Sequence, residues 1–320
     1  MGVERKSLAV VCSRVVPMGM TSALARVLRR VGGGPILDRL AELPGADLTT
    51  LLLGLMRLRT ARLSPADVFR RYGSDRFVTP ADVPYERLRA TEDRLMSLLP
   101  TGFRPVTLAP VAPLGLHSVV GSVHQDKVLS TVRGNEVAAD PTNGLALLAA
   151  DARQRLGPRS TEEVRLAATQ RVVRAQFTGR TPGLLAHFGL LGMVTAGRDT
   201  GDLEFERRHA VEHLRYAATA LPGRVELWLT VWEPRYAVVA DAVRAALPDV
   251  TVVDDPDREA GRDYYTGFAF KVNLVDGTSR VDVGDGGFVD WTQRLLGNRK
   301  ERLLTSGIGI DRLATWDVGP

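Results

Sequence analysis

The feature that most restricts the fold is the way β-rich runs recur from Phe103 onward. They come in pairs joined by short turns, and helical stretches separate the pairs. Two pairs are predicted hairpins, one turning at Gly134-Asn135 and the other at DGTS, residues 276–279. Because a hairpin places its strands antiparallel, the pattern predicts an α+β fold in which helices pack on a mostly antiparallel sheet.

The other predicted elements follow the same alternation. β-rich runs lie at residues 165–177, 187–197, 224–231, 250–255, 267–275 and 280–284, and helical patterns at 143–155, 202–220, 234–247 and 292–297.

Residues 19–99 carry helical signals in succession instead. Asp47 stands where an N-cap is expected, and Ser64 and Thr79 each precede a proline, which suits the first turn of a helix. The sequence therefore predicts an N-terminal helical region, residues 1–99, and a β-containing domain, residues 100–320.

The number of cysteines and the length of the apolar runs argue against a disulfide-rich protein and against a membrane-spanning protein. Cys12 is the only cysteine, so the chain has neither a disulfide framework nor a cysteine-based zinc site, and a reducing cytoplasm is the expected compartment. The longest apolar runs, such as Leu51–Met56 with its neighbours, are far too short to span a bilayer. We therefore expect no membrane partner.

Net positive charge is concentrated near the N-terminus. Residues 1–75 hold 12 of the 42 Lys and Arg residues but only 6 of the 37 Asp and Glu residues. Such a surface could attract RNA or an acidic carrier protein. The same charges would also serve simply to solvate helix faces.

Three stretches near the C-terminal end occur in a characteristic order. They are GRDYYTGFAFKV (261–272), VGDGGFVDWTQRLLGN (283–298) and TSGIGIDRL (305–313). Together they resemble the last third of the catalytic domain of histidyl-tRNA synthetase and its paralogues, which carries a GLDYY element, a GGRYDGL element and the third class II motif. The resemblance implies a class II synthetase-like antiparallel sheet that binds ATP with Mg²⁺, usually within a homodimer.

Four earlier stretches extend the resemblance to roughly residues 100–313. LAATQRVVRAQF (166–177) looks like the second class II motif, HFGLLGMVTAG (187–197) like the strand that returns from it, and TVRGNEVAADPTNG (131–144) like the preceding hairpin and loop. TLAPVAP, near Pro110, is a weaker counterpart of the first motif, which serves the dimer interface in that family.

The resemblance implies a nucleotide site. Arg174 corresponds to the second-motif arginine at the α-phosphate, and Arg312 to the third-motif arginine near the γ-phosphate and adenine. Phe188 corresponds to the aromatic residue on the other face of adenine, and Gln176 stands where the family has an acidic residue. A planar guanidinium with directed donors suits phosphate binding. Without the resemblance, the two arginines could equally form surface ion pairs and Phe188 could be a core residue.

The resemblance also implies an amino-acid site. Tyr264 and Tyr265 would line it at the start of a central strand, and Asp140 with Thr142 would take the place of the loop that holds the substrate amino group. The family's arginine four positions before the first tyrosine is replaced by Ala260, for which Arg262 or Arg258 could substitute. Ordinary sheet packing would equally account for the two tyrosines.

Several departures from the family make histidine an unexpected substrate. Val194 stands at the position of a substrate-contacting glutamate, and the arginine-proline-glutamate loop has become Asp140-Pro141-Thr142. The printed chain ends seven residues after Leu313, so we expect no anticodon-binding domain.

One competing motif is present. His209, Glu212 and His213 fit the H-x-x-E-H pattern of some zinc peptidases. Arg207, Arg208 and Arg215 surround it and would repel a divalent cation, so we expect no metal site there.

Two functions of different classes remain from the sequence. One is ATP-dependent adenylation of an amino acid or related carboxylate, followed by transfer to a small molecule, carrier protein or RNA. The other is a non-catalytic subunit that resembles the regulatory subunit of ATP phosphoribosyltransferase.

Overall fold

The computed structural model describes residues 22–175, 185–277 and 279–316. The chain divides into two compact units, residues 1–62 and 63–320. The first unit contains helices α1 (Ser22–Val31), α2 (Pro35–Ala41) and α3 (Gly45–Thr60). The expected boundary at residue 99, which rests on the resemblance, lies within the second unit and stays a prediction.

The helices of residues 22–97 confirm the predicted helical character but correct two of their starts. Helix α4 (Pro65–Tyr72) begins as expected, because Ser64 and Asp67 form a reciprocal capping box. Helix α3 has Pro44 at its N-cap, so Asp47 lies in the first turn. There its negative charge interacts favourably with the positive end of the helix dipole.

Helix α5 (Tyr85–Ser97) starts after Pro84, not at Thr79. A proline five residues into a helix would remove a backbone hydrogen bond and clash with the preceding turn.

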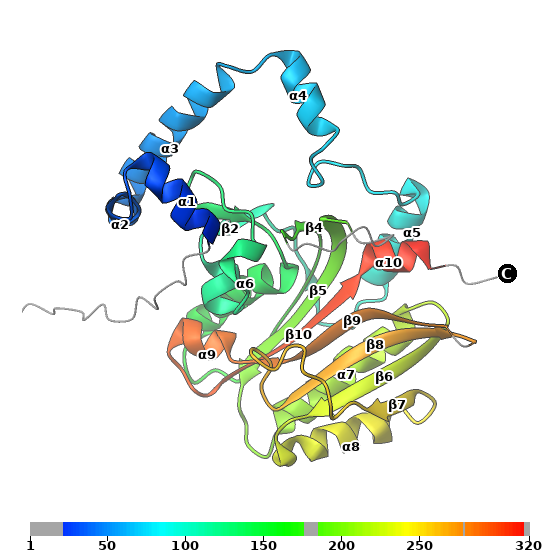
Figure 1. Ribbon diagram of the computed structural model, residues 1–320. Coiled ribbons are helices and arrows are strands. Elements are labelled where there is room, and N and C mark those ends of the chain that lie inside the picture. The colour runs from blue at the N-terminus through cyan, green and yellow to red at the C-terminus, as the bar shows by residue number, and fades with distance from the viewer. Residues whose placement is uncertain (1–21, 176–184, 278, 317–320) are drawn as a thin grey trace, which may run out of the picture. The chain divides into compact units, whose positions relative to one another are not determined.

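The second unit is built on one large sheet, which confirms the predicted fold class (Figure 1). Its strand order is β1-β4-β5-β10-β9-β8-β6-β7. The six central strands pair antiparallel, and only the outermost pairs, β1 with β4 and β6 with β7, are parallel. The strands are β1 (Arg104–Pro105), β4 (Val164–Val173), β5 (His187–Arg198), β6 (Arg224–Val231), β7 (Thr251–Asp254), β8 (Phe268–Asp276), β9 (Ser279–Val289) and β10 (Glu301–Gly309).

The prediction of a hairpin at Gly134-Asn135 is wrong, because two regular strands do not pair across this turn. β3 (Asn135–Val137) pairs with β2 (Val111–Pro113), and the run before Gly134 contributes only a bridge between Ser130 and Glu136. The buried carboxylate of Glu136 explains the change, because it accepts hydrogen bonds from residues 115, 117 and 125 and so fixes β3 against that segment.

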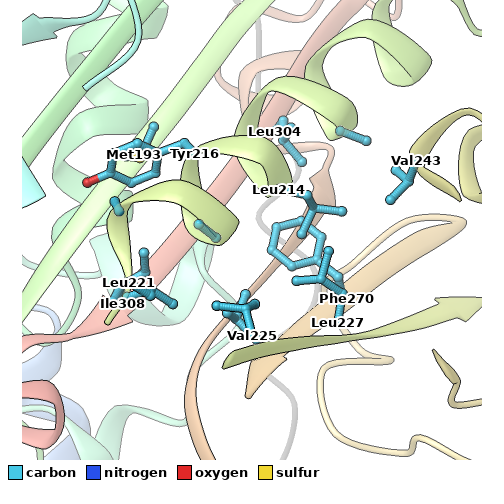
Figure 2. Close-up of a cluster of buried hydrophobic side chains, with 14 of the residues drawn as sticks. Met193, Leu214, Tyr216, Leu221, Val225, Leu227, Val243, Phe270, Leu304 and Ile308 are labelled. Carbon is cyan, nitrogen blue, oxygen red and sulfur yellow. The ribbon is translucent and has the colours of Figure 1, made fainter. Parts of the chain in front are cut away.

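Helices cover both faces of the sheet. On one face, α7 (Glu204–Ala220) and α8 (Ala237–Ala246) bury the larger core; Figure 2 shows Leu214 of α7 close to Leu227 and Phe270 of the sheet. On the other face lie α6 (Pro141–Leu156) and α9 (Trp291–Leu296). The short helix α10 (Ile310–Thr315) follows β10 directly. In the described part of the chain, no helix is both long and apolar enough to cross a bilayer.

Strand β5 shows how the two cores arise from one sequence. Its residues alternate, so Leu191 and Met193 belong to the core under α7, whereas Val194 and Ala196 belong to the core under α6. Helix α6 can approach the sheet closely because Gly192 has no side chain, and a Cβ there would lie 2.8 Å from the ring of Pro141.

Candidate functional site

A cavity of about 280 Å³ lies where β5, β9 and β10 meet the first turns of α6 and α10. Its lining includes Asp140, Arg174, Phe188, Asp282, Asp285 and Arg312. The structure thus brings together the three residues expected at a nucleotide, Arg174, Phe188 and Arg312. Arg174 follows β4, Phe188 lies in the neighbouring strand β5, and Arg312 follows β10, which the antiparallel sheet places beside β5.

Glycines form part of the cavity wall. Among the described atoms, a Cβ on Gly307 would meet none closer than the carbonyl oxygen of Asp285 at 4.0 Å, and a Cβ on Gly309 none closer than 3.6 Å. Added side chains at these positions would therefore extend into the cavity. Their absence lets a ligand approach the backbone of β10 closely.

Arg174 follows the last residue of β4 and is held by two contacts to the start of α6. Its Nη2 lies 3.0 Å from Oδ2 of Asp140, and its Nε donates to the carbonyl oxygen of Ala139 at 2.9 Å. Its guanidinium also lies 5.1 Å from the ring centre of Phe188. Among residues 22–175, 185–277 and 279–316, these hydrogen bonds use two of the five guanidinium N–H groups, and the others could donate to a ligand in the cavity.

Arg312 lies in the first turn of α10, where it is exposed and donates to the carbonyl oxygen of Asp282. Burial raises the pKa of the Asp282 carboxyl, although the charge of Arg312 opposes the shift. The neighbouring Asp311 ties α10 to β5, because its carboxylate accepts from the backbone N–H of Gly189 at 2.6 Å and from Arg171 at 2.9 Å. The hydrogen bonds of Asp311 therefore hold α10, and with it Arg312, in place beside β5.

Asp140 and Thr142 belong to the N-terminus of α6. Asp140 is the N-cap, and its Oδ1 accepts hydrogen bonds from the backbone N–H of Thr142 at 2.8 Å and from its hydroxyl at 2.7 Å. The other carboxylate oxygen of Asp140 faces Arg174. Asp140 thus lies at the cavity, whereas the Thr142 hydroxyl is engaged in the cap.

Tyr264 and Tyr265 lie against the α6 face of the sheet. Their ring centres are 4.3 Å apart, and the ring of Tyr264 stacks at 6.4 Å on Trp291. Tyr265 covers Gly287, where a Cβ would lie 2.7 Å from its Cδ1. Burial, and then the charge of Asp285, raises the pKa of Tyr264 to about 12. The two rings thus pack on the sheet and lie near Asp285, and their place in an amino-acid site stays a prediction.

Arg258 occupies this region, whereas Arg262 does not reach it. Arg258 is only 4% exposed and donates to Asp285, to the carbonyl oxygen of Phe270 and to that of Ala260. Arg262 has a side chain that is 62% exposed and lies 3.6 Å from Glu259.

Asp285 itself was not singled out from the sequence. Burial raises the pKa of its carboxyl, and the nearby charges of Asp282 and Asp140 contribute. The only signal for it was a charged residue directly before two glycines in a β-rich run.

Two further residues complete the comparison with the sequence. Gln176 lies outside the described residues. Val194 is fully buried in the core under α6.

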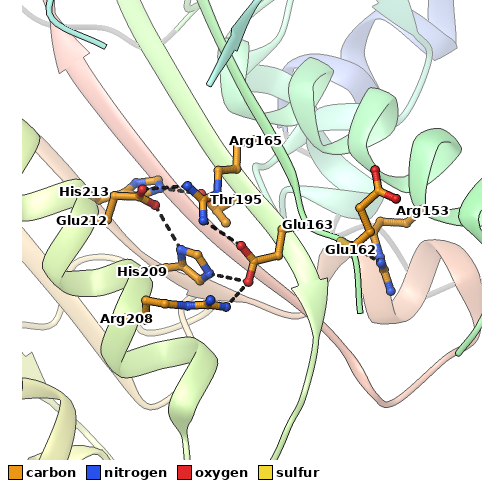
Figure 3. A network of polar contacts seen from close by, with 9 residues as sticks. All are labelled: Arg153, Glu162, Glu163, Arg165, Thr195, Arg208, His209, Glu212 and His213. Carbon is orange, nitrogen blue, oxygen red and sulfur yellow. Dashed lines mark hydrogen bonds and ion pairs between the residues drawn. The ribbon is translucent and has the colours of Figure 1, made fainter. Parts of the chain in front are cut away.

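The H-x-x-E-H residues form a structural network (Figure 3). His209 lies between the carboxylates of Glu163 and Glu212, at 3.0 and 3.1 Å. His213 is buried between the hydroxyls of Thr195 and Ser306, at 2.9 and 2.6 Å. In the described ranges, no group of three or more His, Cys, Asp or Glu side chains could hold a metal ion. The motif therefore joins α7 to the sheet.

Several solved structures of aminoacyl-tRNA synthetases have a fold similar to that of this chain. No protein-family model and no curated protein matches the sequence. A structure described as an ATP phosphoribosyltransferase regulatory subunit/histidyl-tRNA synthetase from Bacillus halodurans C is similar with a TM-score of 0.59 and 14% identity, over 74% of this chain and 81% of that one.

Two histidyl-tRNA synthetase structures show the same similarity. The one from Nostoc sp. PCC 7120 has a TM-score of 0.56 and 14% identity, over 75% of this chain and 73% of that one. A histidine–tRNA ligase subunit from Alicyclobacillus acidocaldarius has a TM-score of 0.53 and 16% identity, over 74% and 94%. The second unit therefore has a class II synthetase-like fold, and the resemblance to the histidyl branch is confirmed at the level of the fold.

Proposed function

We propose that the cavity binds ATP and that the protein adenylates an amino acid or related carboxylate. The observation that carries this proposal is the gathering of Arg174, Phe188 and Arg312 around one glycine-walled cavity. Arg174 would hold the α-phosphate with its free donors, Phe188 would contact adenine, and Arg312 would bind the γ-phosphate or cover the base. Preorganised positive charge at the reacting phosphate is the main requirement of such a reaction.

The residues of the cavity also fit Mg²⁺ carried by the nucleotide. The carboxylates of Asp282 and Asp285 are among the groups that line it, and they would offer oxygen ligands to the ion. Mg²⁺ commonly binds through one or two carboxylates together with substrate phosphates. The raised pKa values of Asp282 and Asp285 reflect buried carboxyl groups that a metal ion or an ammonium group would stabilise in the charged form.

In the proposed reaction, a carboxylate oxygen of the substrate attacks the α-phosphorus and pyrophosphate leaves with the electrons of the broken P–O bond. A nucleophile of a small molecule, carrier protein or RNA then attacks the acyl carbon, and AMP leaves. Asp140 would accept a hydrogen bond from the substrate ammonium group, while Tyr264 and Tyr265 would limit the space for its side chain. Arg258, which pairs with the cavity carboxylate Asp285, would take the role that the resemblance gives to an arginine near the two tyrosines.

Histidine is not the proposed substrate. With Val194 buried in the core and the amino-group loop changed, the polar atoms of bound histidine would lose their partners, at about 1 to 3 kcal/mol for each unpaired group.

The test is ATP–pyrophosphate exchange with each proteinogenic amino acid, using the intact protein, Arg174→Ala, and Arg244→Ala on α8 as a matched surface control. We expect exchange with a non-histidine amino acid, its loss in Arg174→Ala and its retention in the control. Exchange with histidine alone would refute the substrate assignment.

A second candidate function is a non-catalytic binding subunit. It is favoured by the packing of Tyr264 on Trp291 and of Tyr265 over Gly287, because rings held in this way would serve the sheet and need not contact a substrate. The neighbour from Bacillus halodurans carries a regulatory subunit in its description. Exchange with no amino acid, together with retained nucleotide binding, would favour this function.

A further inference from the structure

A second cavity lies away from the candidate nucleotide site. It measures about 390 Å³ and is lined by the first turn of α7, the turn after β6, the end of β9 and the residues that lead into β10. The two cavities share no lining residue. The nucleotide cavity borders residues 282–285 of β9 and 307–309 of β10, whereas this one borders residues 288–290 and 303, toward the opposite ends of the same strands.

A buried carboxylate oxygen at this cavity has no protein partner. Glu206 lines the cavity and is only 1% exposed. Its Oε1 accepts a hydrogen bond from Nε of Arg302 at 2.9 Å, but its Oε2 is buried without a hydrogen-bond partner among the described residues. A buried carboxylate oxygen left unpaired is costly, so the site favours a ligand that donates a hydrogen bond there.

The same cavity has a cation that is free to bind an anion. Arg299 lines it and is exposed, and its guanidinium makes no ion pair or hydrogen bond with any described residue. The other two arginines are engaged, since Arg235 pairs with Glu233 at 2.8 Å and Arg302 pairs with Asp199 at 2.9 Å and with Glu206. The cavity therefore has a hydrogen-bond acceptor without a donor, on Glu206, and a cation without an anion, on Arg299.

The charge of the lining indicates the class of ligand. Glu206, Glu233 and Asp290 are matched in number by Arg235, Arg299 and Arg302, so a ligand without net charge is favoured. Tyr236, which is 5% exposed and also lines the cavity, presents an aromatic surface beside them. A molecule with one ammonium and one carboxylate group satisfies both open groups and keeps the site neutral.

We propose that this cavity is a second small-molecule site for a zwitterionic α-amino acid. The ammonium group donates to Oε2 of Glu206, and the carboxylate binds the guanidinium of Arg299, which suits bidentate contacts. The site is independent of the proposed adenylation, because it shares no lining residue with the nucleotide cavity. It gives an amino acid a place to bind at the far ends of two strands that also wall the nucleotide cavity.

The experiment is calorimetric titration of the full-length protein with each of the 20 proteinogenic amino acids, followed by titration of the N-acetyl and α-amide derivatives of any that bind. Four proteins are compared: the unaltered chain, Glu206→Gln, Arg299→Ala and, as the control for the nucleotide cavity, Asp285→Asn. Thermal unfolding without ligand checks that each variant is folded. Because Glu206 is buried and paired, the exposed Arg299→Ala variant keeps the test valid if Glu206→Gln does not fold.

We expect at least one amino acid to bind with an affinity that falls about tenfold or more in Glu206→Gln and in Arg299→Ala but is unchanged in Asp285→Asn. We expect N-acetylation or amidation to weaken that binding by a similar factor. Binding that is lost in Asp285→Asn and retained in Arg299→Ala belongs to the nucleotide cavity and overturns the second site. Absence of binding by all 20 amino acids also overturns it, and leaves the adenylation proposal to its own exchange assay.

Discussion

Nη2 of Arg258, in the loop before β8, lies 3.0 Å from Oδ2 of Asp285, in the middle of β9. The Arg258 guanidinium also lies 5.4 Å from the ring centre of Tyr265 and donates to the carbonyl oxygen of Phe270. One buried cation therefore links a cavity carboxylate, an aromatic wall residue and the backbone of a central strand. Residues that act through such a contact hold a site in shape even where they do not touch a ligand.

Replacement of Arg258 by alanine should therefore both weaken the fold and disturb the cavity. Removing it leaves Asp285 without its cation and deletes two hydrogen bonds to carbonyl oxygens, for an expected loss of about 2 to 4 kcal/mol in the free energy of unfolding. Arg262→Ala is the matched control, since that side chain is mostly exposed, and it should change the free energy by less than about 0.5 kcal/mol. Urea denaturation measures both, and equal effects would contradict the assigned role of Arg258.

Nucleotide binding should depend on both arginines of the cavity. Arg174→Ala and Arg312→Ala each remove charge-assisted contacts to phosphate, for an expected loss of about 1.5 to 3 kcal/mol in the binding of ATP with Mg²⁺. Calorimetry of the two variants beside Arg244→Ala tests this. Unchanged affinity in both would exclude the cavity as the nucleotide site.

Gly307 allows a test that separates the cavity from the fold. Alanine at this position meets no protein atom closer than 4.0 Å, so the strand should remain as stable or gain slightly, as a glycine within a strand is unfavourable. The added methyl group would extend into the cavity, so the affinity for ATP should fall severalfold. Thermal unfolding and ATP titration of Gly307→Ala are measured together, and lost stability with unchanged affinity is the contrary result.

The sequence predicted the sheet because strand alternation and turn residues are local properties. β5, for example, appears as a clear apolar run, whereas the strand β10 was expected only from the resemblance of residues 305–313 to the third class II motif. It misplaced the partner of β3, since that pairing depends on Glu136, a residue whose burial brings in donors from residues 115, 117 and 125. Similarly, it left Arg258 and Arg262 as alternatives. The direction in which each side chain of a loop points depends on the path of the backbone, which the local sequence does not determine. The arginines and the phenylalanine of the cavity were predicted from a resemblance rather than from any local pattern.

Self-association should involve the region near Pro110. From the resemblance, we expect a homodimer that forms through this segment. An apolar cavity of about 260 Å³ lies beside it, lined by residues that include Leu108, Val111 and Leu148. Light scattering at micromolar concentration should give the mass of a dimer, and Val111→Asp, on an exposed strand residue, should shift it toward the monomer. A monomer for the unaltered protein would contradict the prediction.

Stability should fall as the pH decreases through the range in which histidine titrates. Burial, together with the charges of His209 and Arg165, lowers the pKa of His213 well below its usual value of 6.5. Between the two pKa values the unfolded chain binds a proton that the folded protein does not, so the free energy of unfolding rises with pH there. The stabilisation is complete above about pH 6.5 and is lost as the pH falls below it, with a slope of up to about 1.4 kcal/mol per pH unit.

His213→Gln removes this titration, and His124→Gln is the matched control because the His124 side chain is 70% exposed. Urea denaturation at pH 7.5, 6.5 and 5.5 should show a weaker pH dependence for His213→Gln than for the unaltered protein, even if the variant is less stable at every pH, because glutamine does not ionise in this range. The control should keep the original slope. An identical slope in His213→Gln would mean that other groups, and not this buried imidazole between Thr195 and Ser306, govern the acid side of the stability curve.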